Sequence, residues 1–128
     1  MKVRKHRPVI LIVDDDFSVL GALRRLLRAA GFEVRTFDRP SALLSANIPA
    51  DNACLLLDVH LPEMSGVELK QQLVACGHDL PAVMITGRND SRTRRLLGDA
   101  TVLTKPFEEG LLLGAISRAL NGAEKPRH

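Results

Sequence analysis

Residues 9–16 read VILIVDDD, an unbroken apolar run that ends in three consecutive aspartates. Such a run has no polar face, so it predicts a short strand that is buried on both sides, as in the middle of a parallel sheet. Residues 54–58, CLLLD, repeat the pattern with an apolar run that ends in Asp58. Ligands of parallel sheets bind outside the carboxyl ends of the strands. The two segments therefore predict a central sheet with carboxylates gathered at one edge.

Apolar and amphipathic segments alternate along the rest of the chain. Short apolar runs predict strands over residues 9–13, 33–37, 54–57, 82–85 and 100–103. Segments with helical spacing predict helices over residues 18–30, 40–46, 65–76, 91–97 and 107–120, the third of them capped by Ser65. This alternation predicts an α/β fold, a doubly wound five-stranded parallel sheet with helices on both faces.

The length of 128 residues suits one domain. We expect this domain to span residues 8–121. A basic N-terminal tail, residues 1–7, would precede it, and residues 122–128 would form a C-terminal tail or the start of a linker. With four phenylalanines and no Trp or Tyr, the core must be mainly aliphatic.

The composition argues against several classes of function. The net charge of +3 is small, and the basic termini lack interleaved aromatic residues or a helix-turn-helix pattern, which argues against direct nucleic-acid binding. The histidines are scattered, so no zinc cluster is expected. Cys54 and Cys76 are isolated, and we expect both to be buried thiols in a reducing cytosol. No apolar run reaches membrane-spanning length and no signal-peptide core is present, so we expect a cytoplasmic protein without membrane contact.

Side chains that could bind a phosphate or a cation follow four of the predicted strands. They are Asp14, Asp15 and Asp16 after the first strand, Asp58 after the third, Thr86 after the fourth and Lys105 after the fifth. Clustered carboxylates repel one another unless a cation neutralises them, and a set of oxygen donors favours Mg²⁺. A single aspartate after a strand is often only a helix cap, but the combination favours a site that holds a phosphoryl group.

Four segments together resemble one known family. They are Val13-Asp14-Asp15, the stretch DVHLPEMSG at residues 58–66, Ile85-Thr86-Gly87 and Lys105-Pro106-Phe107. In this order they are similar to the motifs of the receiver domain of bacterial response regulators, from about Pro8 to Leu120. Residues 64–69, MSGVEL, further resemble the branch that includes nitrogen-fixation regulators. The resemblance implies a flavodoxin-like fold with strand order 2-1-3-4-5.

The resemblance also implies an acceptor and a metal site. Asp58 is the expected phosphoacceptor, which takes a phosphoryl group from the phosphohistidine of a sensor histidine kinase or phosphotransfer protein, or from a small phosphodonor. Asp15, Asp58 and the backbone carbonyl of His60 are expected to bind Mg²⁺, with Asp14 assisting through water. Mn²⁺ is expected to substitute for Mg²⁺.

Further matching residues have implied roles around the phosphoryl group. Lys105 would pair with Asp58 and then with the phosphoryl oxygens, and Thr86 would donate a hydrogen bond to them. The peptide bond that follows Lys105 is expected to be cis, as is typical of the family. His60 and Arg88 are expected to set the lifetime of the phosphorylated state by controlling the access of water.

The sequence departs from the family pattern on the surface that normally reports phosphorylation. The interval between Thr86 and Lys105 is a few residues short, so we expect a shortened fourth helix, residues 91–97. Val102 occupies the position of a switching Tyr or Phe, so the usual rotation of an aromatic ring cannot occur. The chemistry at Asp58 is expected to be intact while the output is altered.

Two other functions remain open at this stage. One is an adaptor on the receiver fold that works without phosphorylation, because a fold alone does not fix a function. The other is a phosphatase of the haloacid-dehalogenase type, with Asp14 as nucleophile and Asp16 as acid/base, although this leaves residues 58–66 unexplained.

The expected role is signalling rather than catalysis on other substrates, with activity limited to the domain's own phosphorylation and dephosphorylation. The expected partners are a sensor histidine kinase or phosphotransfer protein and a downstream protein or output domain. A homodimer through the fourth helix, fifth strand and fifth helix is left open, because that face is the altered one. The sequence names neither the kinase, the signal nor the output, and it does not distinguish a stand-alone receiver from part of a longer protein.

Overall fold

A single parallel sheet forms the centre of the computed structural model, which describes residues 7–87, 91–98 and 100–124. The strand order is β2-β1-β3-β4-β5, as predicted. The strands are β1 (Val9–Val13), β2 (Glu33–Phe37), β3 (Ala53–Asp58), β4 (Ala82–Thr86) and β5 (Val102–Thr104). Every residue of β1 and β3 is buried, as expected for strands covered on both faces.

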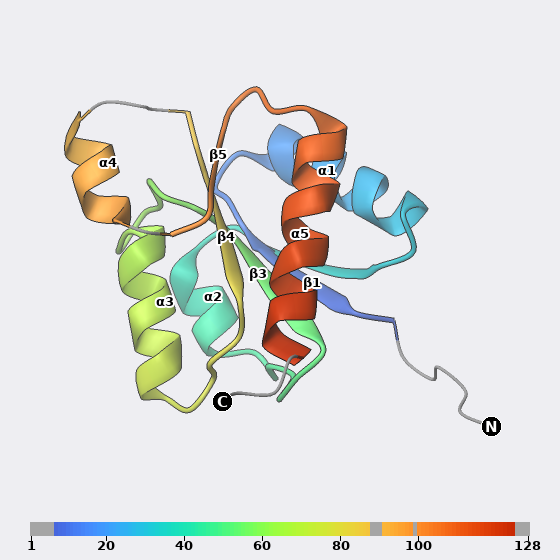
Figure 1. The fold of residues 1–128 in the computed structure, drawn as a ribbon. Coiled ribbons are helices and arrows are strands. Elements are labelled where there is room, and N and C mark those ends of the chain that lie inside the picture. Colours follow the sequence, from blue (N-terminus) through green and yellow to red (C-terminus); the bar gives the residue numbers. More distant parts are fainter. Residues whose placement is uncertain (1–6, 88–90, 99, 125–128) are drawn as a thin grey trace.

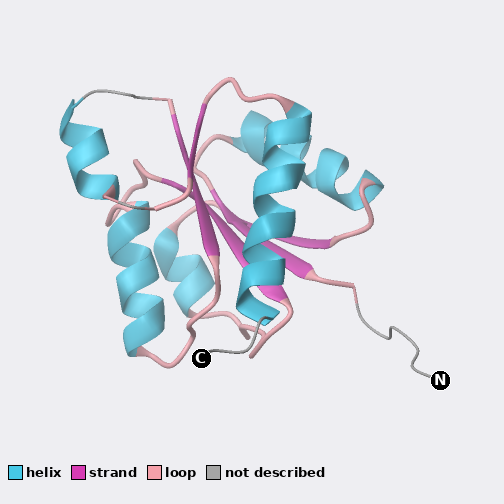
Figure 2. Ribbon diagram, in the orientation of Figure 1, coloured by secondary structure: helices cyan, strands magenta, loops and turns pink. Residues whose placement is uncertain are grey.

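Helices cover both faces of this sheet (Figures 1 and 2). They are α1 (Phe17–Ala29), α2 (Pro40–Leu44), α3 (Gly66–Ala75), α4 (Ser91–Leu97) and α5 (Glu109–Glu124). Alternate strand residues point to opposite faces, and this divides the core in two. Ile10 and Leu56 pack with α1 and α5, whereas Leu11 and Leu57 pack with α2, α3 and α4. The predicted fold class is confirmed.

The ends of several elements differ from the prediction. The fifth strand begins at Val102 rather than at residue 100, because the N–H of Ala100 donates to the carbonyl of Leu97 and closes the turn after α4. The last helix begins at Glu109, and Phe107 packs against the core from the preceding loop. The short fourth helix is confirmed as Ser91–Leu97. Within the described residues, none of the helices combines the length and apolar character needed to cross a membrane.

The two cysteines lie in different environments. The prediction of buried thiols is correct for Cys54 and wrong for Cys76, which is exposed at the C-cap of α3, where a helix end meets solvent. Burial raises the pKa of the Cys54 thiol from its ordinary value of 9.0 to about 12. Only the thiolate is nucleophilic, so the reactive fraction of Cys54 falls by about a thousandfold.

We therefore expect one reactive thiol in the folded protein. At neutral pH a thiol-specific reagent should modify Cys76 quickly and Cys54 only after denaturation, as counted by intact mass. The Cys76→Ser variant, which retains only Cys54, serves as the control. Its rapid modification in the folded state would contradict the assignment.

Candidate functional site

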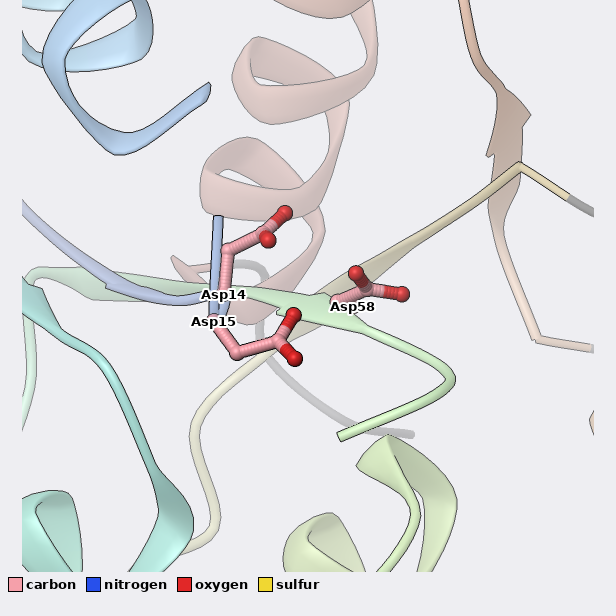
Figure 3. Close-up of side chains that lie close together, drawn as sticks. All are labelled: Asp14, Asp15 and Asp58. Atoms are coloured by element: carbon pink, nitrogen blue, oxygen red, sulfur yellow. The ribbon is translucent and has the colours of Figure 1, made fainter. Parts of the chain in front are cut away.

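Three aspartates meet at the carboxyl edge of the sheet. Asp14 and Asp15 follow β1, and Asp58 ends the neighbouring strand β3. Val13 is paired with Leu57 in the register of these strands, so the residues that follow them lie side by side. The three side chains point into a common space (Figure 3), and one ligand atom from each lies within 4.8 Å of the other two. The predicted convergence of these carboxylates is confirmed.

The side chain of Lys105 contacts two of these carboxylates. Its Nζ lies 3.0 Å from Oδ2 of Asp14 and 3.1 Å from Oδ2 of Asp58. The backbone N–H of Lys105 donates to the carbonyl of Thr86 over 2.7 Å, which fixes the loop after β5 to the end of β4. The contact with Asp58 matches the prediction, whereas the contact with Asp14 is additional. The bond between Lys105 and Pro106 is cis, as predicted.

Burial gives these charges unusual acid–base properties. Asp14 has no exposed surface, and desolvation raises its pKa despite hydrogen bonds from the backbone of Asp16 and from Lys105. Burial opposes the charge of Lys105 as well, but its hydrogen bond to Asp14 and the nearby carboxylates outweigh this and raise its pKa. One ammonium thus lies beside a cluster of three carboxylates and contacts two of them. A divalent cation among the oxygens of Asp14, Asp15 and Asp58 would relieve the remaining repulsion, and these donors fit Mg²⁺.

The loop between β3 and α3, residues 59–65, is anchored to β4 at its start and closed onto its own first residue at its end. The N–H of Val59 donates to the carbonyl of Ile85, and the N–H of Gly66 donates to the carbonyl of Val59. The N–H of His60 donates to Oδ1 of Asp58 over 3.0 Å. The first residues of the loop are thus oriented by the carboxylate that precedes them. The metal contact of the His60 carbonyl stays a prediction.

Gly66 is required by this arrangement. A Cβ built on Gly66 would lie 2.4 Å from the carbonyl oxygen of Asp58, closer than any real contact. We expect Gly66→Ala to lower the free energy of unfolding by about 2 kcal/mol, because the backbone at Asp58 must move. Urea unfolding measures this. Gly87→Ala is the matched control, since its Cβ would meet nothing within 4 Å, and an equal loss in both variants would contradict the explanation.

The remaining predicted residues have different outcomes. Thr86 is only 1% exposed at the end of β4, at the same edge as Asp58. Arg88 lies outside the described residues, so its predicted role stays a prediction. Asp16 accepts hydrogen bonds from the N–H groups of Ser18 and Val19 and acts as the N-cap of α1. This is the ordinary role of an aspartate after a strand.

Val102 is half-buried and pairs with Met84 in the sheet. It packs as an aliphatic residue against the core on the α3 side. The position thus holds a small core side chain in place of the ring that the family pattern would supply.

Two contacts of the β3–α3 loop are not predicted by the sequence analysis. The carboxylate of Glu63 accepts two hydrogen bonds from Ser41 at the start of α2. The ring of His60 lies 3.4 Å from Oγ1 of Thr93, a buried residue of α4. Helical spacing from Leu97 could have marked Thr93 as facing inward. No local pattern points to Glu63, because its partner is distant in the sequence.

Comparison with known proteins agrees with this geometry. The sequence profile described as "Response regulator receiver domain" matches residues 10–117. The response regulator protein TodT of Pseudomonas putida is 40% identical over 122 residues, which are 93% of this chain and 54% of TodT. The transcriptional regulatory protein FixJ of Azorhizobium caulinodans is 33% identical over 120 residues, 91% of this chain and 57% of FixJ. The chain thus spans about half the length of the curated relatives it matches.

Solved structures show the same fold. The response regulator StyR superposes with a TM-score of 0.78 at 45% identity, over 90% of this chain and 60% of StyR. The structure titled FixJ-N superposes with a TM-score of 0.81 at 29% identity, over 98% of this chain and all of the other. With the profile match, the strand order and the aspartate cluster, these similarities lead to one assignment: the chain belongs to the family of response regulator receiver domains.

Proposed function

We propose that this receiver domain is a phosphoacceptor that takes a phosphoryl group on Asp58 from the phosphohistidine of a sensor histidine kinase or phosphotransfer protein. The observation that carries the proposal is the trio of aspartates at the carboxyl edge of the sheet, with Lys105 in contact with two of them. Asp58 is buried but keeps 6% of its surface exposed at the edge of the sheet, and its backbone is fixed in β3.

In the proposed reaction a carboxylate oxygen of Asp58 forms a bond to phosphorus while the bond from phosphorus to the donor's imidazole nitrogen breaks. The imidazole then takes a proton from solvent. Asp15, Asp58 and the carbonyl of His60 would hold Mg²⁺ or Mn²⁺, with Asp14 assisting, and the ion would supply positive charge to the phosphoryl oxygens.

The protein's own groups position and stabilise the charge that is transferred. Lys105, 3.1 Å from Asp58, keeps its ammonium beside the carboxylate and would follow the charge onto the phosphoryl oxygens. Thr86 lies buried at the end of β4, from which its hydroxyl would donate to the same oxygens. His60 and Arg88 would limit the access of water and so set the lifetime of the acyl phosphate.

The direct test is phosphorylation by a small donor. The chain is incubated with Mg²⁺ and acetyl phosphate, and intact mass is recorded with and without a chelator. We expect an adduct of one phosphoryl group that forms only when the metal is present. The absence of any adduct with small donors and with kinases would instead support an adaptor that works without phosphorylation.

An apolar groove beside Lys105 fits a partner that delivers the phosphoryl group. The groove is lined by Pro106 and Phe107 and by four residues of α1: Val19, Ala22, Leu23 and Leu26. A donor protein must bring its phosphohistidine to Asp58, and Lys105 borders both this groove and the aspartate cluster. We propose that the kinase docks here.

We expect Ala22→Arg to lower kcat/KM for phosphotransfer at least tenfold, because a charged side chain would enter an apolar contact. The measurement uses a purified kinase that phosphorylates the unaltered chain. Phosphorylation by acetyl phosphate should not change. Ala75→Arg, at an exposed alanine of α3, is the matched control, and an equal loss there would contradict docking in the groove.

We further propose a cytoplasmic signalling role without catalysis on other substrates, in a domain that spans residues 8–121. The new charge at Asp58 would shift the population between two existing conformations. A downstream protein or an output domain would respond to the shift, and dimerisation stays open.

A further inference from the structure

The β3–α3 loop contains one residue with an unusual backbone. Glu63 has a φ of 72°, in the left-handed region of the backbone that residues other than Gly, Asn and Asp seldom adopt. This conformation turns the loop toward α2, where the Glu63 carboxylate accepts hydrogen bonds from the N–H and the hydroxyl of Ser41, both over 2.9 Å. A local backbone cost is thus accompanied by a two-point contact with another segment.

The contact completes the start of α2. Arg39 is the N-cap residue of this helix, but its side chain makes no capping hydrogen bond, and Pro40 follows it without an N–H. The N–H of Ser41 would have no partner within its helix. The Glu63 carboxylate supplies that partner from outside, and a negative charge at a helix N-terminus is favourable. The two hydrogen bonds between Ser41 and Glu63 therefore stabilise both the left-handed backbone of Glu63 and the start of α2.

The same loop carries the groups next to Asp58. The N–H of Val59 fixes the start of the loop to β4, the N–H of Gly66 closes the loop onto Val59, and the N–H of His60 donates to Asp58. Between these ends the Glu63 carboxylate joins the loop to α2 by two short hydrogen bonds. The contact of His60 with Thr93 on the other side is longer, at 3.4 Å. Without the bonds from Ser41, Glu63 would be free to return to negative φ, which would redirect the chain between His60 and Gly66.

We propose that Glu63 is a positioning residue for the metal site, which holds the β3–α3 loop so that the His60 carbonyl and the Asp58 carboxylate are oriented for a divalent cation before it binds. The inference rests on the proposed function, because that function assigns the His60 carbonyl to the metal. Glu63 touches neither the metal nor the phosphoryl group and acts through the loop.

The experiment compares Glu63→Asp and Glu63→Gln with the unaltered chain. Aspartate keeps the charge and tolerates left-handed backbone, but it is one methylene too short to reach Ser41. Glutamine keeps the length but removes the charge, and its NH2 group cannot accept the hydrogen bond that the Ser41 hydroxyl donates to Glu63. Because the chain contains no Trp or Tyr, Mg²⁺ binding to the unphosphorylated protein is measured by titration calorimetry. We expect both variants to bind Mg²⁺ about tenfold more weakly, as is typical when support outside the metal ligands is lost.

A second readout separates positioning from general damage. Phosphorylation by acetyl phosphate should slow by the same factor at limiting Mg²⁺ and recover at saturating Mg²⁺, since Asp58 and Lys105 are unchanged. Ser41→Thr, which keeps both donors, should behave like the unaltered chain. Glu33→Gln removes one carboxylate at the start of β2, where it pairs with Arg35, and should leave Mg²⁺ affinity unchanged.

The outcomes are distinct. Unchanged Mg²⁺ affinity in both Glu63 variants would overturn the proposal and leave Glu63 as a cap of α2 only. Weaker binding in Glu63→Gln alone would overturn it in favour of a simple effect of charge. In either case the unaltered chain still binds Mg²⁺ and forms the adduct, whereas failure of the unaltered chain to do both would overturn the proposed function itself.

Discussion

Asp58→Asn is expected to abolish the phosphoryl adduct that acetyl phosphate and Mg²⁺ form on the unaltered chain. An amide cannot attack phosphorus, so the loss should be complete rather than partial. The fold should be preserved, because the asparagine oxygen can still accept from the N–H of His60. The substitution also removes the repulsion between the buried carboxylates of Asp58 and Asp14. Intact mass measures the adduct, and circular dichroism checks the fold.

Two matched variants make this result specific to Asp58. Asp38→Asn removes a carboxylate that pairs with Arg39 outside the aspartate cluster and should retain the full adduct. Asp14→Asn should slow the reaction but not prevent a bond to Asp58. An adduct that persists in Asp58→Asn and disappears only in Asp14→Asn would contradict the proposal and support the phosphatase alternative.

Lys105→Met should give the second large effect, a rate of phosphorylation about a hundredfold lower, which is typical when a stabilising donor is removed from a transition state. The ammonium lies within 3.1 Å of both Asp14 and Asp58, so its loss would leave the transferred charge to the metal and the Thr86 hydroxyl. Mg²⁺ affinity should not fall, because Lys105 competes with the ion for the same carboxylates. Stopped reactions analysed by mass give the rate, and calorimetry gives the affinity.

A lower phosphorylation rate without a loss of Mg²⁺ affinity would test the role of Lys105. A variant that is merely misfolded would lose both the reaction and the binding of Mg²⁺. Lys70→Met is the matched control, since Lys70 pairs with Asp79 at 3.3 Å on the α3 side, and it should change neither quantity. A phosphorylation rate within about twofold of the unaltered chain in Lys105→Met would contradict the proposed role.

The sequence was sufficient for the sheet and for the edge at which the site lies. Continuous burial on both faces requires runs such as residues 9–13 and 54–57 to be apolar throughout, so the pattern is visible without a structure. The boundaries of β5 and α5 were less accurate, because hydrogen bonds such as that from Ala100 to Leu97 decide where an element begins or ends. The exposure of Cys76 was missed for a similar reason, since it depends on how a helix end packs.

Taken alone, the sequence determined which side chains stand at the ends of the strands, because strand ends follow from local apolar patterning and the parallel order brings those ends together. Only the tertiary structure decided how these side chains pair. It buries Asp14 completely, places Lys105 between Asp14 and Asp58, and joins Glu63 to Ser41. Such contacts link segments distant in the chain, and their energies depend on distances and desolvation that exist only after folding.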